Sequence, residues 1–272
     1  MNRLHTHLPN RFLGFTLIET IIVIVITGII GGMVAVFIKA PVDAYMDSGR
    51  RAALTDVADT AVRRMSRDIR KALPNSVRTP SSQCIEFIPT KTGGRYRADS
   101  TAEGLDFTAA DTSFNMFGSN SSLPSDQQIA NGDVIAVYNL GITGSDAYNE
   151  DNTSAITASP TEAGAPIETT ITISSKLFPF ASGSNRFHVI PQNEKIVAFV
   201  CSGGKLYRTA SSTFSSACPT TGAILANNIS ACNFVYNGSD LQRNALVQLT
   251  LKFTDSGETV SLYHEVHVNN TP

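Results

Sequence analysis

The chain has 272 residues, enough for a substantial hydrophobic core in one large domain or two small ones. Its formal net charge is −2, from 21 Lys and Arg against 23 Asp and Glu. Because basic residues are not in excess, the composition argues against nucleic acid as the main partner.

The first fourteen residues, MNRLHTHLPNRFLG, form a short basic leader. It carries Arg3, Arg11 and two histidines but no acid. Positive charge on a short N-terminal flank keeps that end in the cytoplasm, so we expect everything after Lys39 to be exported. The apolar segment that follows is too long for an ordinary secretory signal, and its end, VFIKAPVDA, is a poor cleavage site.

Residues 15–40 form an apolar segment that is long enough to cross a membrane. The 24 positions from Phe15 to Ile38 contain one charge, Glu19, and a membrane-spanning helix needs about 20 apolar residues. A charge within such a helix costs roughly 2.5–3.5 kcal/mol on insertion scales, so it is usually paired or functional. A cut between Gly14 and Phe15 would create an α-amino group one helical turn from Glu19. The two charges could then neutralise each other within one chain or between adjacent chains.

The sequence GFTLIE at residues 14–19, between a basic leader and an apolar helix, resembles the class III signal of type IV pilins and type II secretion pseudopilins. The resemblance implies that a prepilin peptidase cuts after Gly14 and that Phe15 becomes the N-methylated first residue. It also implies that Glu19 pairs with the N-terminus of a neighbouring subunit during assembly. The alternative is a single-pass membrane anchor with a stray acid.

The apolar segment also contains Gly28, Gly31 and Gly32, of which the first and last make a Gly-x-x-x-Gly pair. In lipid, this spacing lets two helix backbones approach closely. Glycine also costs roughly 1 kcal/mol per residue in a helix, so the triplet could equally be where the helix loosens on leaving the bilayer and entering a filament.

Residues 41–74 are predicted to form the amphipathic half of a spine helix. Apolar residues recur there at three-to-four spacing, with arginines over much of the remaining surface. The apolar positions are Leu54, Val57, Ala58, Ala61, Val62, Met65, Ile69 and Leu73. Pro74 and Asn75 should end this helix. Joined to the apolar segment, it would make a single helix of roughly 90 Å at 1.5 Å per residue. We expect the arginines to be a solvated face, because aspartates alternate with them.

Residues 75–272 are predicted to form an exported, β-rich globular domain. Strand-like runs alternate there with Gly, Ser, Asn and Pro. These runs are CIEFI, DVIAVYNL, ETTITI, RFHVI, KIVAFVC, KLYRT, CNFVY, ALVQLTLKF and TVSLYHEVHV. Hairpins are expected across Gly203–Gly204 and across the DSGE sequence, and long surface loops at 109–130 and 141–166. The fold class is therefore α+β and pilin-like: a long N-terminal helical spine, membrane-spanning in its first half, packed on an antiparallel β-sheet domain.

Four cysteines, Cys84, Cys201, Cys218 and Cys232, all follow the apolar segment. An even number confined to the exported side indicates an oxidising compartment and two disulfides. Zinc is disfavoured, because no two cysteines show the close C-x2-C spacing of zinc ligands. Of the three possible connectivities, proximity in sequence favours a bond from Cys218 to Cys201 or to Cys232.

The spine and the C-terminal runs, ISACNFVYN, ALVQLTLKF and SLYHEVHVNNTP, resemble the large minor pilins of the MSHA pilus system, the MshO type. The resemblance implies a structural subunit that takes part in pilus assembly, at or near the tip. Its partners would be major and minor pilins bound through the N-terminal helix, prepilin peptidase and an inner-membrane assembly platform. The chain would lie in the inner membrane of a Gram-negative bacterium with a periplasmic domain, and afterwards in a surface pilus.

Two other functions fit the same residues. One is a J-type minor pseudopilin of a type II secretion system, which uses the same assembly chemistry in a periplasmic filament. The other is a membrane-tethered binding domain that never polymerises, which should keep its activity without Glu19.

Catalytic motifs are weak, and no enzyme activity and no cofactor are expected. The sequence HEVH resembles a metal motif, but on a strand His264 and His267 point to opposite faces. Asp146, Glu150 and Asp151 form an acidic loop with oxygen ligands of the kind that calcium prefers. Because the twelve-residue ligand pattern of an EF-hand is absent, calcium binding is the less favoured interpretation, and the main expectation is that there is no metal site.

Overall fold

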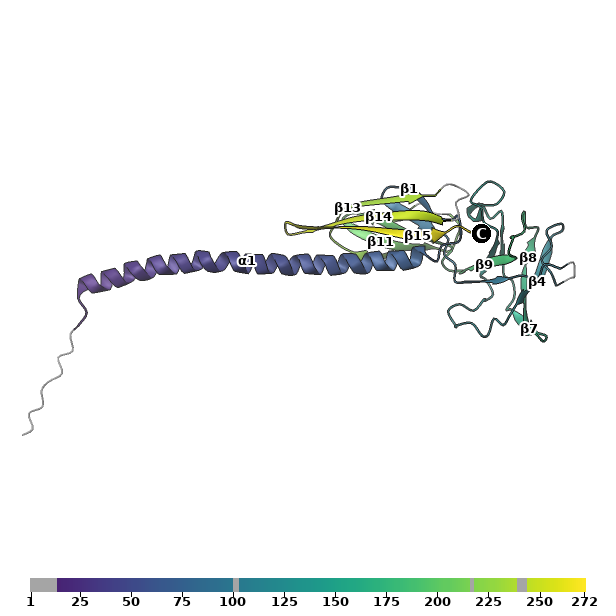
Figure 1. Ribbon diagram of the computed structural model, residues 1–272, viewed down its shortest axis with the longest axis horizontal. Helices are drawn as coiled ribbons and strands as arrows, with labels where there is room; N and C mark the ends of the chain where they lie inside the picture. Colours follow the sequence, from purple (N-terminus) through teal and green to yellow (C-terminus); the bar gives the residue numbers. More distant parts are fainter. Residues whose placement is uncertain (1–13, 100–102, 216–217, 239–243) are drawn as a thin grey trace, which may run out of the picture. The chain divides into compact units, whose positions relative to one another are not determined.

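The computed structural model describes residues 14–99, 103–215, 218–238 and 244–272. The chain divides into two compact units, Met1–Arg50 and Arg51–Pro272, and each is described by itself (Figure 1). The predicted leader lies outside the described residues except for Gly14.

A single helix, α1 (Leu17–Ile69), contains both the apolar segment and the amphipathic segment. The predicted joining of the two segments is therefore confirmed. Pro41 lies inside the helix, where it has no N–H to donate to the carbonyl four residues earlier.

The helix ends at Ile69 rather than at Leu73, so the prediction that Pro74 ends it was wrong. The backbone after Ile69 bonds to the segment that follows the first buried strand. Leu73 N–H donates to the Ile88 carbonyl at 2.8 Å, and Ala72 forms an isolated antiparallel bridge with Pro89. The chain tightens into i→i+3 turn bonds, in which Lys71 and Ala72 donate to Asp68 and Ile69 at 3.0 Å, and the non-local bond of Leu73 follows before the proline is reached.

The amphipathic part of α1 packs on the sheets as the pattern predicted, with one exception. Its buried side chains are Leu54, Ala58, Ala61, Val62, Met65, Ser66 and Ile69. Val57, which was predicted to share this face, is 42% exposed. At about 100° per residue it lies on the border of the apolar stripe.

Two antiparallel sheets cover this part of the helix (Figure 1). The five-stranded sheet has the order β1 (Arg78–Ser81), β2 (Cys84–Phe87), β10 (Ile196–Ser202), β11 (Lys205–Ser211), β12 (Ala223–Ala226). The three-stranded sheet has the order β13 (Ile229–Asn237), β14 (Asn244–Asp255), β15 (Glu258–Asn269). Their inward side chains form one core with α1, in which Met65, Phe87, Phe199, Leu249 and Phe253 are fully buried. The α+β class with an antiparallel sheet domain is confirmed.

A second group of strands has a core of its own within the same unit. One sheet has the order β3 (Thr92–Arg95), β9 (Arg186–Ile190), β5 (Val134–Val137), β6 (Thr153–Ala155). The other has the order β4 (Asp111–Phe117), β8 (Glu168–Lys176), β7 (Thr161–Ala163). A short 3-10 helix, η1 (Ala147–Asn149), precedes β6. Tyr96, Phe114, Phe178 and Phe187 fill this second core, and the two cores meet through a smaller cluster that includes Leu73, Ile88 and Ile196.

Both predicted hairpins are confirmed. Ser202 pairs with Lys205 across Gly203 and Gly204, whose φ angles are +55° and +76°. Two positive φ angles in a row are what a two-residue hairpin turn requires. The second hairpin closes between Asp255 and Glu258.

The two predicted surface loops are only partly loops. Residues 109–130 contain β4, and residues 141–166 contain η1, β6 and β7. These strands are rich in Ser, Thr and Asn, and their alternation is weak. Their pairing with the apolar strand β5 and with the alternating strand β8 overrides the low local propensity.

Candidate processing and assembly site

The predicted cleavage and methylation site lies where α1 begins. Gly14 and Phe15 precede the helix, and the Phe15 side chain is 84% exposed. Thr20 N–H donates to the Thr16 carbonyl at 3.2 Å, which is the first helical bond. Thr16 Oγ1 accepts from Glu19 N–H at 3.3 Å. Thr16 is therefore the N-cap of the helix, and the backbone on both sides of the predicted cut is accessible.

Glu19 lies in the first turn of α1, with an exposed side chain. Its carboxylate accepts a long hydrogen bond of 3.5 Å from the Thr16 hydroxyl. Thr16 and Glu19 have the T-x-x-E spacing of a capping box, and a negative charge in a first turn is favoured by the helix dipole. The prediction from sequence missed Thr16, although this spacing marks it. Among the described residues, Glu19 forms no salt bridge, so its carboxylate is available to a charge brought by processing or by another chain.

The apolar part of α1 exposes its whole surface. Every described side chain from residue 14 to residue 46 is exposed. One described helix, α1, is long and apolar enough to cross a membrane, and an 18-residue window in it has a mean hydropathy of 2.9 with no buried residue. Thr27 donates its hydroxyl to the Val23 carbonyl at 2.6 Å, which satisfies that polar group within the helix. This surface needs lipid or other helices around it, because exposed apolar area on this scale is unfavourable in water.

The glycines of the apolar segment have no intramolecular reason to be glycine. A Cβ added at Gly28, Gly31 or Gly32 would meet nothing within 4 Å. The structure therefore leaves the predicted helix-packing face formed by Gly28 and Gly32 open to a partner. Whether a second helix fills it stays a prediction.

Two disulfides lie around the first core: Cys84–Cys218 joins β2 to the segment between β11 and β12, and Cys201–Cys232 joins β10 to β13. The expectation that Cys218 bonds to a sequence neighbour was wrong. Cys84 of β2 lies opposite Val200 of β10 and shares a small cluster with Ala198, Val200 and Cys218. Because side chains alternate along a strand, Cys201 points to the other face, into the α1 core, where it meets β13. Strand alternation, which sequence distance does not capture, selects the pairing.

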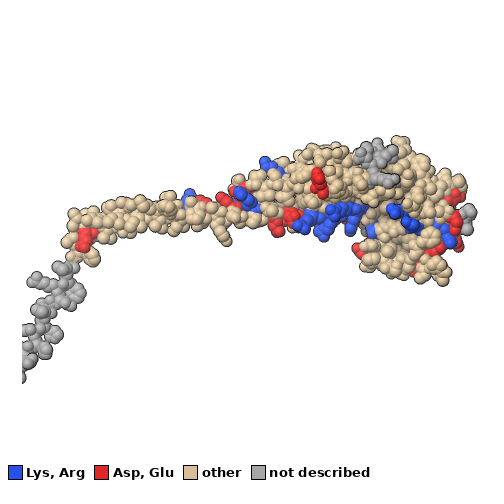
Figure 2. All heavy atoms as spheres, in the orientation of Figure 1, with Lys and Arg blue, Asp and Glu red and all other residues tan. Residues whose placement is uncertain are grey.

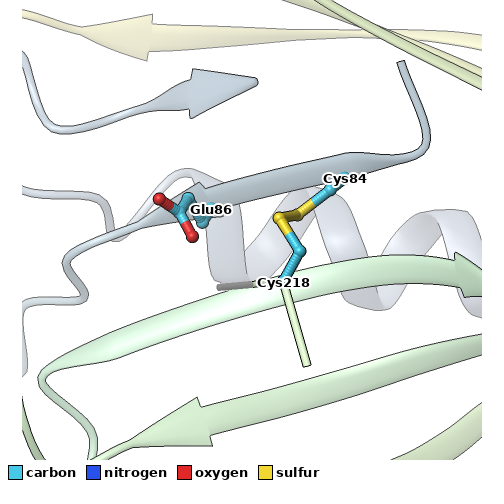
Figure 3. Close-up of side chains that lie close together, drawn as sticks. All are labelled: Cys84, Glu86 and Cys218. Atoms are coloured by element: carbon cyan, nitrogen blue, oxygen red, sulfur yellow. A yellow bond between two sulfur atoms is a disulfide. The ribbon is translucent and has the colours of Figure 1, made fainter. Parts of the chain in front are cut away.

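Cys84, Glu86 and Cys218 are the one group of potential metal ligands that lie close together in the described part of the chain (Figure 3). The two sulfurs are bonded to each other, so neither is a thiolate, the form that binds metal. Glu86 forms a salt bridge with Arg78, and the Arg78 guanidinium lies 3.4 Å from the centroid of the Tyr148 ring. This cluster is an ion pair beside a disulfide.

The predicted calcium ligands lie around η1. Asp146 Oδ1 accepts from Tyr148 N–H at 3.0 Å and caps η1. Asp151 Oδ2 accepts from the N–H groups of Gly144 and Asp146 at 3.0 and 3.2 Å. The Glu150 carbonyl accepts from Lys176 Nζ at 2.8 Å. The two aspartate carboxylates thus stabilise the loop itself, and calcium binding stays a prediction from the sequence.

The HEVH sequence lies in β15, where His264 is half-buried and His267 is exposed. The two side chains are on opposite faces, as the alternation predicted. Among the described residues, no hydrogen bond joins a serine, threonine or cysteine to a histidine ring, so the geometry offers no nucleophile–base pair.

The C-terminal end of α1 is held to the five-stranded sheet by a partly buried charge network that the sequence did not reveal. Arg208 of β11 donates to Asp68 at 2.8 Å and to both oxygens of Glu194 at 2.9 and 3.1 Å. The hydrogen bonds from Arg208 hold the pKa of the Glu194 carboxyl below its usual value. Such bidentate pairs fix geometry as well as charge.

One family model matches the chain: the prokaryotic N-terminal methylation motif, over residues 9–35. This motif contains the GFTLIE sequence and most of the apolar segment. No curated protein and no solved structure matches the chain. The motif indicates a type IV pilin-like or pseudopilin-like protein that is processed by a prepilin peptidase and anchored in a membrane before assembly.

Proposed function

We propose that this chain is a structural subunit of a type IV pilus of the MSHA type, cut between Gly14 and Phe15 and assembled through α1. The single observation that carries the proposal is the methylation motif placed on a helix whose apolar surface has no intramolecular cover. The likeness of the spine and the C-terminal runs to minor pilins supports the MSHA type and a position at or near the tip.

The proposed assembly step rests on electrostatics in a medium of low dielectric. A lone carboxylate at the centre of a membrane helix costs roughly 2.5–3.5 kcal/mol on insertion scales. Glu19 lies near one end of the segment, where the cost is lower, and its only described side-chain partner is the Thr16 hydroxyl. An α-amino group on the Phe15 of an adjacent subunit would neutralise it, so a subunit gains more from the assembled state than from lipid.

The test compares incorporation of full-length chains in the native host. Glu19→Gln removes the charge with little change of shape, and Asp43→Asn makes the same change at an exposed position on the same helix. We expect Glu19→Gln to lower the amount recovered with sheared pili at least tenfold and Asp43→Asn to leave it unchanged. Equal recovery of both variants would favour a tethered domain that does not polymerise.

A second fractionation separates the two filament types. A pilus subunit is recovered from the cell surface after shearing, whereas a type II secretion pseudopilin stays in the periplasmic and membrane fractions. If the chain is recovered only from the periplasmic and membrane fractions and its assembly still depends on Glu19, the pseudopilin function would replace the pilus function.

A further inference from the structure

β15 is the last strand of the three-stranded sheet, and one of its edges is free. It pairs with β14 along its whole length, and no other strand pairs with it within the described ranges. The hairpin that joins β14 to β15 has a two-residue loop, so its closing pair, Asp255 and Glu258, is hydrogen-bonded. Hydrogen-bonded pairs alternate with non-hydrogen-bonded pairs, so every second residue of β15 turns its backbone N–H and C=O to the free edge. These residues also have exposed side chains: Thr259, Ser261, Tyr263, Glu265, His267 and Asn269.

The other edge strands are protected against pairing with a second chain. Proteins blunt such edges with short strands, prolines, bulges or a covering segment. β1 contains Pro80, β12 has four residues and a register shift, and β3, β6 and β7 have three or four residues each. β13 has a register shift, and Phe234 N–H in it donates to the Ser82 carbonyl. The outer edge of β4 bonds to Tyr96 and Arg97.

β15 has none of these protections. It has twelve residues without proline, lysine or arginine, and its register with β14 is unbroken. Among the described strands it is therefore the long edge that is open to another strand.

The inward face of β15 leaves the first core partly open along this edge. Val266 and Val268 are buried, but Val260 and Leu262 are only half-buried against the core. An added strand with apolar side chains on its inward face would cover these two residues and remove their apolar surface from water.

β15 runs in the same direction as the amphipathic part of α1. Glu258, its first residue, accepts from the Arg51 guanidinium at 2.8 Å, and Asn270, just after its end, accepts from the Asn75 N–H at 3.1 Å. Chains anchored through the same apolar segment have parallel helices, and this step rests on the proposed function. Antiparallel pairing of two β15 edges would point the two helices in opposite directions. Because the other described edges are blunted, a second copy offers no matching strand.

The charge beside the free edge indicates the chemistry of the partner strand. Of the six side chains in the outward row, Glu265 is the one Asp or Glu, and the row has no Lys or Arg. In Figure 2, Lys and Arg side chains gather along the amphipathic part of α1, whereas the strands above it show a mostly uncharged surface. A second β15 would add an acid without a cation, whereas a strand with Lys or Arg at the facing position would pair with Glu265.

We propose that the free edge of β15 binds an edge strand of a different protein subunit, added antiparallel, with apolar side chains over Val260 and Leu262 and a Lys or Arg facing Glu265. Main-chain hydrogen bonds supply the binding in this mode, and the alternating side chains select the partner. The antiparallel direction follows the strand pairs of this chain, since every described pair is antiparallel. The contact makes this chain part of a mixed assembly.

The test places a photo-crosslinking phenylalanine derivative at Tyr263 of the full-length chain in its native host. We expect a crosslinked product that contains a different chain. Ser261→Pro removes an N–H that points to the free edge and no bond to β14, so an edge strand tolerates it. This variant should lower the yield of the product about tenfold, the factor that corresponds to about 1.4 kcal/mol. The matched control is Ser261→Val, which changes the same side chain but keeps the N–H and should leave the yield unchanged.

Two further measurements make the result specific. Equal resistance of the two Ser261 variants to protease shows that both fold. Thr259 and His267 are eight residues apart in the outward row, about 26 Å along the strand. Derivatives at these two positions should link to one segment of the partner in reverse order, with a Lys or Arg between the linked sites.

A product made of two copies of this chain, no product at all, links in the same order, or a yield that Ser261→Pro does not change would each overturn the proposal. The Glu19→Gln comparison reports on the filament separately. If Glu19→Gln lowers recovery with sheared pili while no crosslink forms at Tyr263, the pilin role stays and only this contact is removed. A crosslink without an effect of Glu19 would keep the contact and remove the filament.

Discussion

His188 offers a test, depending on pH alone, of the face of β9 opposite the second core, because its neighbours Phe187 and Val189 are the residues that point into that core. His188 lies between Gly93 of β3 and Ala136 of β5. Its Nε2 is buried and has no hydrogen-bond partner among the described residues. Burial, with a smaller contribution from the charge of Arg186, lowers the pKa of the His188 imidazole from 6.5 to about 4.

The sign and size of the effect follow from that shift. Because the pKa of the folded state lies below that of the unfolded chain, the unfolded chain takes up the proton first as pH falls. The stability from a neutral His188 is therefore complete above pH 6.5 and is lost between pH 6.5 and about 4. The pKa of His188 differs by about 2.5 between the unfolded and folded chain. At 1.36 kcal/mol per pKa unit, this corresponds to about 3 kcal/mol in the free energy of unfolding.

The measurement is urea unfolding of the full-length chain in detergent, followed by far-UV circular dichroism at pH 7 and pH 4. His188→Phe keeps a ring of similar size without a titrating group, and His267→Phe is the matched control at an exposed position of β15. Between pH 7 and pH 4, the free energy of unfolding should fall by about 3 kcal/mol more for the unmodified chain and for His267→Phe than for His188→Phe. Equal losses of stability for all three proteins would refute the assignment of the half-buried His188 imidazole as neutral in the folded chain.

Four further variants test the packing of α1 and the links around the first core. Ile69→Ala should lower the free energy of unfolding by about 2–5 kcal/mol because the side chain is fully buried, whereas Val57→Ala should cost less than about 1 kcal/mol, as measured by urea unfolding. The double substitution Cys84→Ala with Cys218→Ala removes a disulfide that closes a sequence separation of 134. Loop entropy predicts that the free energy of unfolding falls by about 5 kcal/mol, and a fall of under about 1 kcal/mol would contradict the pairing. Arg208→Ala leaves two partly buried acids unpaired and should cost about 2 kcal/mol at pH 7, between the surface and buried limits. Because hydrogen bonds from Arg208 lower the pKa of Glu194 in the folded state, that difference should shrink as pH falls below 4.5, the ordinary pKa of the carboxyl.

The elements with strong periodicity could be predicted from the sequence. The apolar stripe of α1 and the apolar strands β5 and β10 are buried, as their apolar composition and periodicity predict. The methylation motif around Gly14, Phe15 and Glu19 was likewise recognisable because it is contiguous, and the roles of these three residues stay predictions.

The missed features depend on contacts that are distant in sequence. The Thr-Gly-Gly-Arg sequence of β3 has low strand propensity, but a Cβ at Gly93 would lie 2.8 Å from the Phe187 carbonyl oxygen. The close approach of β9 therefore requires glycine in this strand. Arg208 and its two acids come from three separate segments, so no local pattern marks them.

The disulfide pairing also could not be predicted from the sequence, because it depends on contacts between distant segments. Cys84 and Cys201 lie on adjacent strands but point to opposite faces of the sheet. Which cysteines meet depends on strand order and register, and neither was available from spacing alone.

The central claim is that processing creates the charge that pairs with Glu19. Mass spectrometry of the N-terminus of the chain purified from its native host tests this most directly. The account predicts a mature protein that begins with N-methylated Phe15. A chain that still begins at Met1, or one cut near Ala40, would contradict it.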